Sequence, residues 1–201
     1  MRVRLVVAGA AAVLAGLAMS GCESAVEGSP NATTTQPDAS GGASTDTSPS
    51  ESDRLSPPVN NPKDLRGIAP CQLLTSAQLA ELSLTEPGQT DLSQWGEEGC
   101  NWLGTVVAIG FSPETTLGEG LDQAYRAKNR FDNFAETSID GYPAVRVNFA
   151  TQSCGLIAGV SDEQTLHMEF TRVSPNAPGK GDPCGFAESV MGEVIKNLPD
   201  A

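Results

Sequence analysis

The chain contains a single histidine, His167, and none of its five cysteines stands in a Cys-x-x-Cys pair. A structural zinc site takes about four cysteine or histidine ligands, usually at close spacings, so this sequence does not predict one. The glycine-rich stretches at 118–123 and 179–185 match neither a phosphate-binding loop nor a dinucleotide-binding turn. No metal and no cofactor is therefore expected.

Basic residues are also scarce, with 12 Lys and Arg against 25 Asp and Glu, a formal charge of −13. Removal of the first 21 residues would take away Arg2 and Arg4 and leave 10 against 25, a charge of −15. Such an acidic surface disfavours nucleic acid and anionic lipid surfaces as partners.

The sequence has no apolar run of the roughly 20 residues that span a bilayer. Its longest uncharged apolar run covers 14 residues, 5–18, and follows Arg2 and Arg4, as in a signal peptide. Met19-Ser20-Gly21-Cys22 then matches a bacterial lipobox, which predicts cleavage after residue 21 and acylation of Cys22. The alternative is an ordinary secretory signal in which Cys22 is incidental. We expect a lipid-anchored protein on the extracytoplasmic face of the cell membrane.

Residues 22–62 contain little that can be buried, because Ser, Thr, Pro, Gly, Ala and Asp dominate after Cys22. Such a composition predicts a disordered tether, which as a flexible coil would span roughly 35 Å. Residues 63–201 remain for a single globular domain with enough chain for a core.

Four cysteines remain once Cys22 is assigned to the anchor, and an even number in an exported chain predicts two disulfides. Three connectivities can be drawn. Separations of 29 and 30 residues favour the sequential pairs Cys71–Cys100 and Cys154–Cys184.

The pattern within the domain predicts helices and hairpins. Thr75 with Gln78 forms a capping box, and Asp182 with Pro183 begins an amphipathic C-terminal helix. Alternating apolar residues predict strand pairs within 100–112, 133–150 and 154–171, and a helix is expected within 115–128. The expected fold is α+β, an antiparallel sheet flanked by helices in the order αββαββββα. Small side chains at 106, 108 and 110 predict a helix packed close to that strand face.

Several short motifs occur in a characteristic order: "APCQLLT" at 69–75, "GCNW" at 99–102, "DGYPAVRV" at 140–147 and "DPC" at 182–184. In these the chain resembles a group of actinobacterial lipoproteins catalogued as a domain of unknown function. The resemblance implies a PsbP/Mog1-like fold, a sheet flanked by helices. It implies no catalytic residues.

Candidate site residues follow from strand alternation. Thr165, His167, Glu169 and Thr171 share one face, and Leu166, Met168 and Phe170 share the other. The favoured interpretation is an exposed strand histidine, and the alternative is a general base oriented by Glu169. Asp162, Glu163 and Glu169 do not have the spacing of a calcium loop.

Trp102, two residues after Cys100, should share the strand face of that cysteine. It is expected to pack against a disulfide or under a helix. A role in stacking on a ligand is the alternative, so Trp102, His167 and Glu169 are the candidate ligand contacts.

Two functions remain. The favoured one is a non-catalytic, surface-tethered binding or interaction module of the cell envelope, whose partner is an envelope protein or a small ligand. The alternative is a hydrolase-like envelope enzyme whose site forms only in the fold. A concave site with convergent polar groups around His167 would favour the enzyme. A flat polar face or an apolar groove would favour binding.

Overall fold

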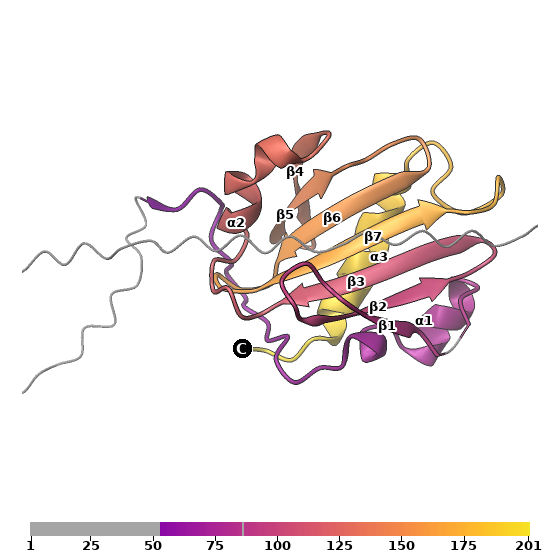
Figure 1. Ribbon diagram of the computed structural model, residues 1–201, viewed down its shortest axis with the longest axis horizontal. Helices are drawn as coiled ribbons and strands as arrows, with labels where there is room; N and C mark the ends of the chain where they lie inside the picture. Colours follow the sequence, from indigo (N-terminus) through magenta and orange to yellow (C-terminus); the bar gives the residue numbers. More distant parts are fainter. Residues whose placement is uncertain (1–52, 86) are drawn as a thin grey trace, which may run out of the picture. The chain divides into compact units, whose positions relative to one another are not determined.

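The computed structural model describes residues 53–85 and 87–201 of the chain. Cys22, the predicted signal peptide and most of the predicted tether lie outside these residues. No helix in the described part is long and apolar enough to cross a bilayer. Seven strands form one antiparallel sheet in the spatial order β1-β2-β3-β7-β6-β5-β4 (Figure 1).

The strands follow one another in the chain as β1 (Gln89–Leu92), β2 (Glu98–Leu103), β3 (Val107–Glu114), β4 (Phe134–Ile139), β5 (Tyr142–Val147), β6 (Ser153–Gly159) and β7 (Thr165–Arg172). The helices are α1 (Ser76–Glu81), α2 (Asp122–Arg126) and α3 (Pro183–Asn197), with 3-10 turns η2 (Pro70–Gln72) and η3 (Lys128–Arg130). The capping box at Thr75 and the N-cap at Asp182 are both present, as predicted.

The expected α+β fold in the order αββαββββα is wrong, because an additional strand, β1, precedes β2. All four residues of β1 are exposed and most are polar, so no alternating pattern marks the strand. Antiparallel pairing with β2 holds it at the sheet edge. The helix expected within 115–128 shortens to α2, because Gly118 and Gly120 take left-handed φ angles of 69° and 52°. Only α3, with 15 residues, exceeds two turns among the described helices, so the sheet dominates.

Helix α3 crosses one face of the sheet (Figure 1) and buries an apolar stripe that includes Met191, Val194 and Ile195. The facing side chains of β7 alternate as predicted, with Met168 and Phe170 at most 1% exposed. Burying each such side chain stabilises the fold by roughly 1.5–3 kcal/mol. The α3 side of the sheet therefore holds the main core.

Helix α2 lies on the opposite face. Leu121 and Ala124 form a second apolar cluster with Val145, Val147 and Ile157. The residue between the two valines, Arg146, points the other way and forms a bidentate ion pair with Glu188 of α3, with N–O distances of 2.6 and 2.7 Å. The second cluster lies over β5 and β6, and no described helix covers β3 and β7 on this face.

Both disulfides are present with the predicted sequential pairing. Cys71–Cys100 joins η2 and its loop to β2, and Cys154–Cys184 joins β6 to the first turn of α3. Each bond therefore fixes a covering segment to the sheet on the main-core side.

The described end of the predicted tether, 53–62, is hydrogen-bonded to the domain. Ser56 donates to the Asp122 carboxylate through its amide and hydroxyl, at 2.8 and 2.6 Å. Arg54 pairs with Asp162 at 2.5 Å, and Asp162 also accepts from the amide of Val59. Partial burial opposes ionisation of both carboxyls, but these hydrogen bonds outweigh it and lower the pKa of each.

We expect the Cys154→Ala/Cys184→Ala double variant to lose about 2–4 kcal/mol of unfolding free energy, because a closed loop of 30 residues restrains the unfolded chain. Urea unfolding monitored by circular dichroism measures the loss. The Cys71→Ala/Cys100→Ala variant opens a loop of similar length and serves as the comparison. Non-reducing peptide mapping that finds crossed pairs would contradict the assignment.

Candidate functional site

A groove lies on the sheet face opposite α3, between the loop that follows β1 and the α2–η3 segment. It encloses about 650 Å³, a volume typical of small-molecule sites. Its lining includes two of the residues predicted from the sequence, His167 and Glu169. The other lining residues are Gln94, Trp95, Leu117, Gln123, Ala124, Ala127, Arg130, Phe131, Val147, Asn148, Leu156 and Ile157.

Two glycines next to Glu169 leave room for neighbouring side chains on this face of the sheet. Glu169 pairs across the sheet with Gly155 on one side and Gly110 on the other. A Cβ at Gly155 would lie 3.0 Å from the Glu169 carboxylate, and one at Gly110 would meet the Asn101 amide oxygen. Gly110 therefore leaves room for the side chain of Asn101. The helix predicted to pack against the small residues on this strand face is not found among the described elements.

Trp95 forms a roof over His167. The two rings have centroids 4.5 Å apart and are tilted by 49°. The indole Nε1 donates to the carbonyl of Pro113 at 2.7 Å, which fixes the ring against β3. The tight turn that carries Trp95 is closed by the amide of Gly96, which donates to Ser93 O at 3.0 Å with φ 84° at Gly96.

His167 is accordingly half-buried rather than exposed, which corrects the favoured interpretation from sequence. Its face of β7 is as predicted, opposite Leu166 and Met168, but the Trp95 roof removes much of its contact with water. Burial lowers the pKa of His167 to about 4, so the ring is neutral at pH 7. Nε2 lies 3.1 Å from Thr165 Oγ1, and burial raises the pKa of Glu169.

The geometry around His167 is not that of a nucleophile and base. Ser112 is the cross-strand neighbour of His167, but no hydrogen bond joins them within the described residues, nor does one join His167 to Glu169. Thr165, which does contact the imidazole, is 1% exposed and offers no access to a substrate. An activated nucleophile requires both a hydrogen-bonded base and an open approach.

Two further carboxyls shape the groove wall. The Glu97 carboxylate accepts hydrogen bonds from the amides and hydroxyls of Thr115 and Thr116, at 2.8–3.1 Å. Glu114 is fully buried and accepts from the amide of Leu117 at 2.6 Å. Burial raises the pKa of Glu114, and its second oxygen has no partner in the described structure. Glu97 and Glu114 thus hold in place the loop that brings Leu117 into the groove.

The structure places Trp102 in the core at 2% exposure, edge-on to Phe111 with centroids 6.4 Å apart. A Cβ added at Gly88 would collide with both Cys100 Sγ and the Trp102 indole, so Gly88 closes over this cluster. Trp102 therefore does not join His167 and Glu169 in the groove. Trp95, which does, was missed because nothing in its loop sequence indicates which residue the ring covers.

The carboxylates near His167 in sequence do not gather around it either. Asp162 is paired with Arg54, and Glu163 lies 3.5 Å from Arg66. Only Glu169 lies in the groove. No cluster of three metal-ligating side chains occurs among the residues that the structure describes.

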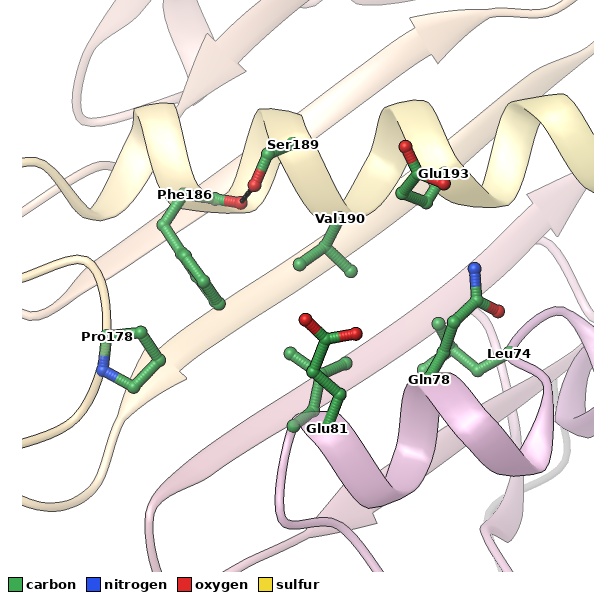
Figure 2. Close-up of a pocket in the computed structure, with 9 residues that line it drawn as sticks. Leu74, Gln78, Glu81, Pro178, Phe186, Ser189, Val190 and Glu193 are labelled. Atoms are coloured by element: carbon green, nitrogen blue, oxygen red, sulfur yellow. Dashed lines mark hydrogen bonds between the residues drawn. The ribbon is translucent and has the colours of Figure 1, made fainter.

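A second cavity of about 350 Å³ separates α1 from α3 on the main-core side. Figure 2 shows Glu81 on α1 and Glu193 on α3, on opposite sides of this gap. The floor is apolar, and neither histidine nor arginine lines it. The groove over His167 is larger and brings together aromatic, amide, acidic and basic groups, so it is the better candidate site.

A family model described as "Protein of unknown function (DUF3558)" matches residues 17–197. No curated protein and no solved structure matches the chain.

The burial of His167 predicts a specific pH dependence. Because its folded pKa of about 4 lies below the ordinary 6.5, the unfolded chain binds the proton first as the pH falls. The unfolding free energy of the wild type should drop relative to His167→Gln between about pH 6.5 and 4, and the two curves should run parallel above about pH 7. Urea unfolding across this range measures the difference. An NMR titration giving the imidazole a pKa near 6.5 would contradict the burial.

Proposed function

The chain belongs to DUF3558, a family of proteins of unknown function, and from that premise we propose that it is a lipid-anchored, extracytoplasmic binding module of the actinobacterial cell envelope. Family membership brings no activity with it, so the proposal rests on the sequence of the N-terminal segment and on the groove. The PsbP/Mog1-like fold implied by the resemblance stays a prediction.

The anchor is supported by the apolar run at 5–18 and by the small residues before Cys22. Two disulfides suit an exported protein, because thiols in the cytosol are kept reduced. Two or more acyl chains on Cys22 would give stable membrane attachment, at about 0.8 kcal/mol for each buried CH₂. The membrane is then a partner through the anchor alone.

Replacing Cys22 by Ala should release the mature protein from the membrane fraction or leave it unprocessed, because no acyl acceptor remains. Membrane fractionation followed by mass spectrometry of the N-terminus measures both outcomes. Ser24→Ala is the matched control, since it changes a nearby residue outside the lipobox. A Cys22→Ala protein that matures and stays membrane-bound would refute the anchor.

The binding role is carried by one observation: a groove of about 650 Å³ in which Trp95 and His167 face amide, apolar and charged groups but no activated nucleophile. A neutral imidazole can accept or donate one hydrogen bond per nitrogen, and an aromatic roof adds contact area. These are features of recognition. We take the ligand to be a small molecule with both apolar and polar parts.

The hydrolase-like alternative keeps one argument in its favour. A cavity that holds two groups with shifted pKa values, His167 and Glu169, is typical of active sites. In this alternative Glu169, the carboxyl that lines the groove, would be the acid–base residue. The two functions differ in whether the bound ligand is chemically changed.

A ligand in the groove should alter the emission of Trp95 and leave that of the core residue Trp102 unchanged. The two are the only tryptophans, so Trp95→Phe should abolish the fluorescence response, and Trp102→Phe, the matched control, should retain it. A small-molecule library screened with the purified chain provides the ligands. The binding role is refuted if Trp95 responds to none of them. Turnover of a bound ligand that is lost in Glu169→Gln would establish the enzyme instead.

A further inference from the structure

Three basic residues in the part of the chain that the structure describes have no acidic partner. Among the described residues, most Lys and Arg side chains pair with Asp or Glu, and Arg172 donates to backbone carbonyls instead. The exceptions are Lys128, Arg130 and Lys180. Two of these three belong to the short turn η3, beside the groove.

Arg130 is the one basic side chain that lines the groove, and it is exposed there. Its neighbour Phe131 also lines the groove and stacks on Phe134, with centroids 6.2 Å apart. Lys128, two residues earlier in the same turn, is exposed and is not part of the lining. The groove therefore has a guanidinium with free donors next to an apolar, aromatic surface.

The rest of the groove determines where an anion can lie. The apolar side chains of Ala124 in α2 and of Ala127, the residue after it, line the groove with Val147 and Ile157. The carboxyl of Glu169 lies on β7, the strand that also carries His167, and would repel an anion. An anionic group is thus attracted to Arg130, and an apolar body fits between α2 and the floor.

We propose that the groove binds an amphiphile with a carboxylate or phosphate head, its head held by Arg130 and its apolar part lying on Ala124, Ala127 and Ile157. This deepens the proposed binding function and rests on it. A guanidinium presents parallel N–H donors that match both oxyanions. The acidic surface still disfavours an anionic bilayer, but at physiological salt charges more than about 8 Å apart are largely screened.

The test uses four probes with the same chain: dodecanoate, dodecyl phosphate, dodecanol and dodecylamine, each below its micelle concentration. Isothermal titration measures binding to the wild type, Arg130→Gln and Lys128→Gln. Arg130→Gln should weaken both anionic probes about tenfold, because a charge-assisted hydrogen bond is lost. Lys128→Gln removes the same charge from the same turn and should change each Kd less than about twofold. The ratio of the dodecanoate and dodecyl phosphate affinities distinguishes the two head groups.

The inference is overturned if dodecanol binds the wild type as tightly as the anions, or if the two variants lose affinity equally. The amphiphile inference fails, while the binding function stands, if none of the four probes binds but a neutral ligand from the library still shifts the Trp95 emission. If no compound changes the Trp95 emission, the proposed binding function is refuted as well. Circular dichroism of both variants checks that they are folded.

Discussion

The packing of α3 across the sheet is the constraint on which the other elements depend. Its apolar stripe meets the inward side chains of β6 and β7, and two further bonds hold it there: the Cys154–Cys184 disulfide and the ion pair of Glu188 with Arg146. Both bonds join the first two turns of α3, at residues 184 and 188, to the neighbouring strands β6 and β5. The main core therefore lies on the α3 side of the sheet.

The opposite face of the sheet carries a smaller apolar cluster, so part of it can form a groove instead of core. Among the described residues, α2 and its small cluster cover it over β5 and β6, and the loop of Trp95 covers His167 on β7. Gly110 on β3 and Gly155 on β6 provide no side chain for a second helix to pack on. This part of the face therefore forms a groove, which the loop of Trp95 covers and η3 bounds.

Residues with strong local signals made much of this structure predictable. The capping pair Thr75–Gln78 is a contact that is short in sequence, and the alternation around His167 is strictly periodic. The cysteine pairs are long in sequence, but the even count and the similar separations of 29 and 30 residues indicated them. Strand β1 and the roof by Trp95 could not be predicted, because both depend on partners fixed only by the tertiary fold. The strand face on which His167 lies was predictable, but its burial under Trp95 was not.

The attachment of residues 53–62 has a mechanical consequence. A pull on the chain at residue 53 first loads the bonds of Arg54 with Asp162, in the β6–β7 turn, and of Ser56 with Asp122, at the start of α2. Along the chain these contacts precede the antiparallel bridge between Lys63 and Asp200. Tension along the N-terminal chain is thus taken up stepwise at the surface, before it reaches either disulfide or the core beneath α3.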